Sequence, residues 1–116
     1  MALAAKLEAG GIANVKSVCA APGISQTNLQ VTAGSNGAVT PGFIMRMSQS
    51  AEDGTMPLLT AMFGVDTKNG EFYEPDGIGG LSGKVAKVQF DKHSTDKAQQ
   101  QLLWEKSEEV CGKFSI

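Results

Sequence analysis

The stretch VKSVCAAPG, residues 15–23, limits the fold more than any other part of the chain. Apolar residues fall on both faces of an expected strand over residues 15–20, which is typical of a strand covered on both sides in a parallel sheet. A helical sequence over residues 1–9, closed by a Gly-Gly pair, leads into this strand. A helix that feeds a buried strand is half of a βαβ unit, so the sequence predicts an α/β fold that lacks the unit's first strand.

Length and charge exclude several classes of protein. A chain of 116 residues has the size of one domain, and its net charge of −2 offers no basic surface to nucleic acid. No apolar run approaches the ~20 residues that span a bilayer. No basic segment precedes an apolar core at the start, so we expect no secretory signal. Cys19 and Cys111 are expected to be reduced thiols, which favours a cytoplasmic protein.

The middle of the chain is expected to hold a long loop and a helix. Residues 30–42 are rich in Gly, Ser, Thr and Asn, as in a loop, and a short helical turn is expected just after them. Ser50 and Asp53 approximate a capping box at the start of a helix over residues 51–63. Pro57 should kink this helix or limit its first half. The expected apolar face of the helix carries Met56, Leu59 and Phe63.

The last third is expected to hold a second strand and a final helix. The strand falls within NGEFYEPDG, residues 69–77, which has turn residues on both sides. The helix begins near Thr95 or Asp96, carries Leu103 and Val110 seven residues apart, and ends at Gly112. The whole chain is therefore expected to contain two strands, three or four helices and one long loop, in a single domain.

Most candidate chemical motifs have a simpler structural interpretation. The glycine run GIGGLSG, residues 77–83, has Ser82 where a dinucleotide loop needs its last glycine, so we expect a surface loop. His93 is the only histidine, and it is too close in sequence to Asp91 and Ser94 to form a catalytic triad by spacing alone. A single histidine and two distant cysteines do not make a zinc site.

The stretch APGISQTNL, residues 21–29, leaves two interpretations open. It can be a strand end, a turn and a helix cap at Thr27 or Asn28. It can also be a ligand site, because binding sites of α/β proteins lie where strands end.

Four segments together resemble the short-chain dehydrogenases/reductases. PGISQTNL resembles the Pro-Gly motif after the family's sixth strand, where PGxxxTxL is a common form. SAEDGTMPLLTAMF and NGEFYEPDG resemble its late helix and seventh strand, and LLWEKSEEVCG resembles the tail of its retinol-dehydrogenase-like branch. The resemblance implies the C-terminal part of a Rossmann-type, doubly wound parallel sheet, with residues 1–116 as one partial domain.

The same resemblance implies where a cofactor and a substrate would bind. Pro22 and Gly23 would shape the wall beside the nicotinamide of NAD or NADP, the Ile24 backbone would face the carboxamide, and Thr27 would bond near the carboxamide or pyrophosphate. Residues 28–50 would form a lid over a carbonyl or alcohol substrate. The lid residues expected to meet that substrate are Leu29, Phe43, Ile44 and Met47.

The resemblance also implies that the catalytic residues are absent. The family's glycine-rich loop and its catalytic Ser and YxxxK all come earlier than the segments matched here. Tyr73 is the only tyrosine, and the residue four positions later is Gly77 rather than lysine. Without a lysine to lower its pKa, a tyrosine is a poor proton donor near neutral pH. Met1 would fall within the helix that carries YxxxK.

Two functional hypotheses follow. In the first, the chain is the C-terminal portion of an oxidoreductase, and it supplies the nicotinamide wall and the substrate lid. In the second, it is a non-catalytic remnant that acts by binding a partner or an intact homologue, through the edge of a sheet that has lost its neighbouring strands. Homo-oligomers are compatible with both.

Overall fold

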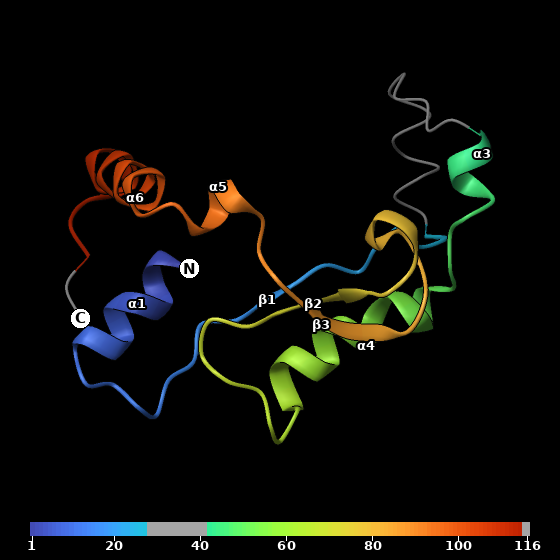
Figure 1. Ribbon diagram of the computed structural model, residues 1–116, viewed down its shortest axis with the longest axis horizontal. Coiled ribbons are helices and arrows are strands. Elements are labelled where there is room, and N and C mark those ends of the chain that lie inside the picture. The colour runs from blue at the N-terminus through green and yellow to red at the C-terminus, as the bar shows by residue number, and fades with distance from the viewer. Residues whose placement is uncertain (28–41, 115–116) are drawn as a thin grey trace. The chain divides into compact units, whose positions relative to one another are not determined.

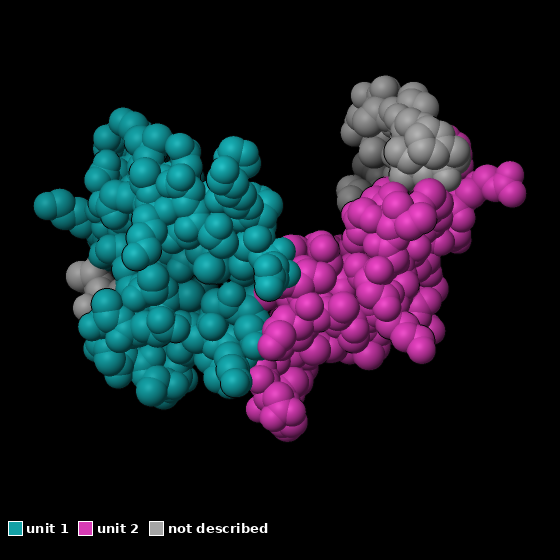
Figure 2. Space-filling model, viewed as in Figure 1, with its two compact units in different colours: residues 1–19, 68–71, 89–116 teal, residues 20–67, 72–88 magenta. Residues whose placement is uncertain are grey.

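The computed structural model describes residues 1–27 and 42–114. The chain falls into two compact units (Figure 2). Unit 1 comprises Met1–Cys19, Lys68–Glu71 and Gln89–Ile116, and unit 2 comprises Ala20–Thr67 and Phe72–Val88. The expectation of one partial domain over the whole chain stays a prediction.

Unit 1 is built from helices at the two ends of the chain. Helix α1 (Ala2–Ala9) contacts helix α6 (Lys97–Cys111), and the four-residue helix α5 (Lys92–Thr95) comes just before α6 (Figure 1). Ala4 and Leu7 of α1 are buried. Both helices that precede the C-terminus begin at an aspartate whose side chain accepts two backbone N–H groups, which satisfies donors that a helix start leaves free.

Asn69 fixes α1 to the segment that leads toward the sheet. Its Nδ2 donates to the carbonyl of Ala4 at 2.9 Å and to the Glu8 carboxylate at 3.0 Å. Its Oδ1 accepts the N–H of Ser17 at 2.9 Å. One amide therefore joins three segments that are distant in sequence, which explains how a helix with only two buried side chains is held in this unit.

The sheet has three short strands in the order β1 (Cys19–Ala20), β2 (Phe72–Pro75) and β3 (Val85–Val88). β1 runs parallel to β2, because the bonds from Cys19 N to Glu71 O and from Ala21 N to Tyr73 O advance in the same direction along both strands. β2 and β3 are antiparallel, in a register that begins with Phe72 opposite Val88. The sheet is therefore mixed.

Helix α4 (Ala51–Phe63) packs on β2 and β3 through its smallest residues. Gly54, Pro57 and Ala61 are buried and lie along one face, whereas the larger apolar residues lie elsewhere on the helix. Ser50 begins the helix as the sequence predicts, because its hydroxyl oxygen accepts the N–H of Asp53 at 3.0 Å. The remaining short elements are α3 (Gly42–Met45) and the 3-10 turn η1 (Ile78–Gly80).

The positions of most helices confirm the sequence-based expectations. The helix ends at Gly10 and Gly112, the helix start at Ser50 and the strand within residues 69–77 all stand where the sequence places them. The α/β class is also confirmed in its coarse form, as a small mixed sheet with helices.

Other expectations were wrong. The segment 85–88 forms a third strand because it pairs with β2, so two strands were too few, and the parallel arrangement holds for β1 and β2 alone. The strand expected over residues 15–20 is only two residues long. Val15 precedes this strand and is exposed, and Cys19 within it is exposed rather than covered.

The expected apolar helix faces are exposed as well. Met56, Leu59 and Phe63 of α4 lie in solvent, since the glycine and alanine face allows the closer approach to the sheet. On α6, Leu103 and Val110 are 69% and 86% exposed. Their seven-residue spacing suggested a stripe facing the core, but these two side chains are not buried.

Trp104, Glu108 and Phe114 form a cluster in unit 1, within α6 and just after it. The indole Nε1 of Trp104 donates to Glu108 Oε1 at 2.9 Å, and the N–H of Phe114 donates to the same oxygen at 3.3 Å. The two rings lie 5.9 Å apart at 60°. The bond from Trp104, followed by the bond from the Phe114 backbone, lowers the pKa of Glu108 below its ordinary value of 4.5.

We expect acid to disturb this cluster through Glu108. A carboxylate whose folded pKa is lowered stabilises the fold above its unfolded pKa, and that contribution is lost as pH falls through the folded value. Trp104 is the only tryptophan, so its emission should change on acidification below pH 4.5 in the native chain and not in Glu108→Gln. Glu109→Gln, an exposed neighbour, should keep the native titration. If Trp104 emission in Glu108→Gln changed with pH as it does in the native chain, Glu108 would not be the group responsible.

Candidate functional site

The turn that follows β1 carries four of the residues singled out in the sequence. Gly23 and Ile24 are partly buried there, and Pro22 and Thr27 are exposed. Met47 lies in the turn after α3 and is partly buried. Leu29 lies outside the described residues, as do the side chains of Phe43 and Ile44, so the proposed lid is represented here by Met47 alone.

Gly23 allows the turn to pack against the glycine loop, residues 77–83. Its φ of +66° is one that side chains rarely adopt, and a Cβ at this position would lie 2.5 Å from the Leu81 carbonyl oxygen and 2.8 Å from that of Gly80. The N–H of Ile24 donates to the Leu81 oxygen at 2.7 Å. The glycine loop, expected to be a plain surface loop, therefore forms the back wall of the Pro-Gly turn.

Gln49 joins the turn, the glycine loop and the start of α4. Its side chain donates to the Pro22 carbonyl at 2.8 Å and accepts the N–H of Gly83 at 3.0 Å. Its backbone donates to Ile24 O at 2.9 Å and accepts from Gln26 N at 3.0 Å, forming a parallel bridge with Ser25. Only 9% of the surface of Gln49 is exposed. Sequence analysis missed it, since nothing local distinguishes a glutamine just before a helix cap.

Helix α4 approaches the turn as closely as its glycine permits. A Cβ on Gly54 would overlap the Ser25 side chain and lie 3.3 Å from the Pro22 carbonyl oxygen. The first two turns of α4 therefore form the second wall of the site. The sequence signal that could have shown this is a glycine inside a helix, which lowers helix stability and needs a packing reason.

Between the turn and α4 lies an open hollow of about 400 Å³. Its volume falls within the range of small-molecule sites, which is roughly 300–1,000 Å³. The turn and the helix contribute similar shares of the lining, which consists of Pro22, Gly23, Ile24, Ser25, Thr27, Ala51, Gly54, Thr55 and Leu58. The structure thus brings the four predicted cofactor-binding residues together in one hollow.

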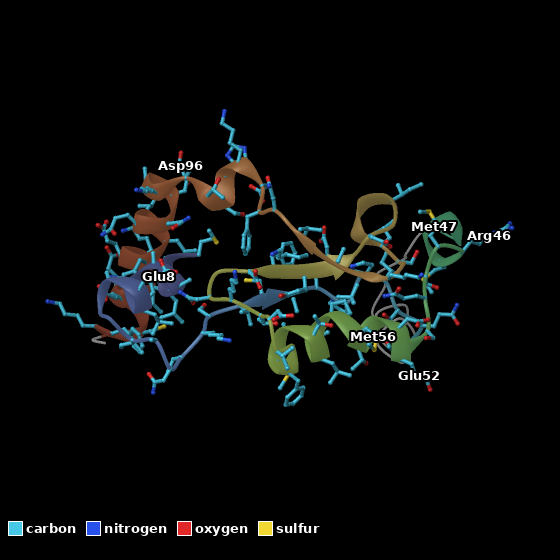
Figure 3. All side chains as sticks on the ribbon, turned by 60° about the horizontal axis from the view of Figure 1, so that its bottom comes forward. Glu8, Arg46, Met47, Glu52, Met56 and Asp96 are labelled. Carbon is cyan, nitrogen blue, oxygen red and sulfur yellow. The ribbon has the colours of Figure 1, made fainter. Side chains whose placement is uncertain are left out.

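The hollow is lined mostly by carbon, and no charged side chain is among its described lining residues. Its described lining offers the hydroxyls of Ser25, Thr27 and Thr55 beside the apolar side chains of Ile24 and Leu58. The two carboxylates of the first turn of α4 lie outside the lining, and Figure 3 shows Glu52 and Met56 on successive turns of that helix. A neutral group with hydrogen-bonding atoms suits such walls better than a phosphate does.

The backbone of Ile24 is already engaged. Its N–H bonds to Leu81, and its carbonyl accepts from Gln49. A carbonyl oxygen has two lone pairs, so the Ile24 carbonyl can still accept one hydrogen bond from a ligand amide. The Ile24 N–H already donates its hydrogen to Leu81 and cannot donate to a ligand.

Two other candidate groups have structural roles away from this hollow. Tyr73 is 8% exposed, and its hydroxyl donates to Thr67 Oγ1 at 3.3 Å inside unit 2. Asp91 accepts the N–H groups of His93 and Ser94 at the start of α5, which lowers the pKa of Asp91, the bonds from Ser94 contributing most. His93 itself is exposed, as expected from the sequence.

The described residues contain no group of three or more His, Cys, Asp or Glu side chains that could hold a metal ion. Within the same residues no helix combines the length and the hydropathy needed to cross a bilayer. Comparison with protein-family models, with curated proteins and with solved structures found no match. The case for a function therefore depends on the geometry of the hollow and on the sequence resemblance.

The close approach at Gly23 can be tested by adding a single methyl group. Gly23→Ala should lower the free energy of unfolding by about 3 kcal/mol, because it combines an unfavourable φ with a backbone clash. Gly79→Ala is the matched control, since Gly79 has a φ of +63° but its added Cβ would meet nothing closer than 3.9 Å. That variant should lose about 1 kcal/mol. Urea unfolding measures both values, and equal losses of unfolding free energy in Gly23→Ala and Gly79→Ala would contradict the close packing at Gly23.

The role of Gln49 is tested by removing its amide. Gln49→Leu leaves the Gly83 N–H without its partner and the Pro22 carbonyl with only the long 3.4 Å bond from Ser25 Oγ, so we expect a loss of about 2 kcal/mol in unfolding free energy. Gln26→Leu, the same change at an exposed glutamine nearby, should cost less than about 0.5 kcal/mol. Hydrogen exchange at Gly83 should accelerate in the first variant and not in the second. Unchanged exchange at Gly83 would rule out this role.

Proposed function

We propose that the chain supplies part of the nicotinamide-binding wall of an oxidoreductase of the short-chain dehydrogenase/reductase type. The observation that carries the proposal is the hollow at the end of β1, which gathers Pro22, Gly23, Ile24 and Thr27 against α4. In α/β proteins this is the usual position of a ligand, beyond the carboxyl end of a parallel strand. The complete enzyme would transfer hydride between NAD or NADP and a carbonyl or alcohol.

The hollow fits the nicotinamide end of such a cofactor and not its phosphates. A nicotinamide has flat apolar faces and one amide, which match Ile24, Leu58 and the three hydroxyls of the lining. The lining has no basic side chain among the described residues, and the two carboxylates in the first turn of α4 oppose the attraction that a helix N-terminus has for a pyrophosphate. When bound, the nicotinamide supplies the hydride chemistry.

This chain's own residues would bind and orient the ring rather than move protons. The Thr27 and Ser25 hydroxyls can bond a carboxamide, and Gly23 lets the turn pack against the Gly80 and Leu81 carbonyls behind it. Tyr73 is buried against Thr67, and Gly77 replaces the lysine that a catalytic tyrosine needs. We therefore assign no catalytic residue to this chain and expect no turnover of aldehydes by the chain alone.

A second candidate function is binding without catalysis. The observation that favours it is the exposed apolar surface along α4 and just after it, where Met62, Phe63 and Val65 are 70%, 71% and 93% exposed. Exposed apolar patches often mark surfaces that meet another protein. This candidate needs no ligand in the hollow, so a ligand titration separates the two.

The titration uses nicotinamide mononucleotide and adenosine monophosphate with the full chain. Nicotinamide mononucleotide should bind with a Kd on the order of millimolar, because only part of a pocket is present. The amide resonances of Ile24, Ser25 and Thr55 should shift in heteronuclear NMR spectra. Adenosine monophosphate should shift them less, since its purine lacks the carboxamide that the Ser25 and Thr27 hydroxyls would bond.

Two substitutions on α4 provide the matched comparison. Thr55→Trp fills the hollow from an exposed lining position and should abolish the shifts. Met62→Trp introduces the same ring at a position outside the lining and should preserve them. The proposal fails if nicotinamide mononucleotide gives no shifts at the hollow, or if Thr55→Trp responds like the native chain.

A further inference from the structure

A second hollow lies in unit 1, formed by α6, the start of α1 and the residues that follow α6. Its volume is about 290 Å³, at the lower limit of small-molecule sites, which begin at roughly 300 Å³. The main apolar contributors are Leu103, Trp104, Cys111 and Phe114, and almost all of the lining is carbon. Nothing in the proposed oxidoreductase function uses this hollow.

The aromatic walls of the hollow are held in place by hydrogen bonds. Glu108 Oε1 accepts from both the Trp104 indole and the Phe114 backbone, so one carboxylate restrains the indole and the backbone that carries the second ring, and the two rings lie at 60° to each other. Gly112, with a φ of +89°, allows the chain to turn after α6. The Lys6 ammonium lies 4.6 Å from the Trp104 ring centroid, a cation–π contact that further restricts the indole.

The charges around the hollow favour a neutral occupant. The Glu108 carboxylate forms part of the lining and would repel an anion. A cation would compete with Lys6 for the charge of Glu108 and would lose its hydration against carbon walls. A flat neutral molecule loses little hydration free energy on entering the hollow. It can stack on one of the two tilted rings or meet it edge to face.

We propose that this hollow binds a small neutral aromatic molecule of one or two rings, packed against the Trp104–Phe114 pair. The ring would contact Leu103 and Cys111 as well, and no bond would be formed or broken. The site is independent of the hollow at Pro22–Thr27, so either can fail without the other.

Three probes that share one ring and differ in charge test the proposal: benzyl alcohol, benzoate and benzylammonium. Each is titrated into the full chain while Trp104 emission and the amide resonances of Leu103, Cys111 and Phe114 are followed. Benzyl alcohol should give a saturable change, and both ions should bind about tenfold more weakly, which corresponds to a desolvation cost near 1.4 kcal/mol.

Two variants decide whether the hollow is the site. Phe114→Ala removes one aromatic wall and should weaken benzyl alcohol binding about fivefold. Leu103→Ser, at an exposed position of the lining, should weaken it too, and Phe63→Ala, at an exposed phenylalanine of unit 2, should not. The proposal is overturned by a response linear in benzyl alcohol, by equal binding of benzylammonium, or by native affinity in both unit 1 variants.

Discussion

The side chain of Gln49 holds together the part of the molecule in which a ligand could bind. A single buried amide bonds the Pro22 carbonyl on one side and the Gly83 N–H on the other, so the turn after β1 and the glycine loop cannot separate without leaving polar groups unpaired. The next residue, Ser50, begins α4. Gln49 therefore helps to fix the helix relative to the turn, together with the close approach of Gly54 to Ser25.

The local features of the fold were predictable from sequence because the forces that produce them are local. Ser50 begins a helix through the N–H of Asp53, and the glycines at 10 and 112 end helices, all within a few residues of the signal. The Pro-Gly turn is of the same kind. Each of these features involves neighbours in sequence, so no knowledge of the rest of the chain was needed.

The tertiary features were not predictable, for equally physical reasons. The partners of the Gln49 side chain are 27 and 34 residues away, and nothing at residue 49 indicates them. The apolar pattern of α4 suggested that Met56, Leu59 and Phe63 face the core, yet Gly54 and Ala61 do, because small residues allow the helix closest to the sheet. The proposal of a nicotinamide site rests on the sequence resemblance and on the hollow that Pro22, Gly23, Ile24 and Thr27 line with α4.

The shortness of β1 has a consequence for how this chain would meet others. In a parallel pair, alternate residues turn their peptide groups to opposite sides, so within β1 Cys19 bonds toward β2 and Ala20 faces outward. A short edge of this kind gives an incoming strand little backbone to pair with, which discourages edge-to-edge association. Strand addition is therefore disfavoured at β1, and this holds for β1 alone, since β3 forms the other edge of the sheet.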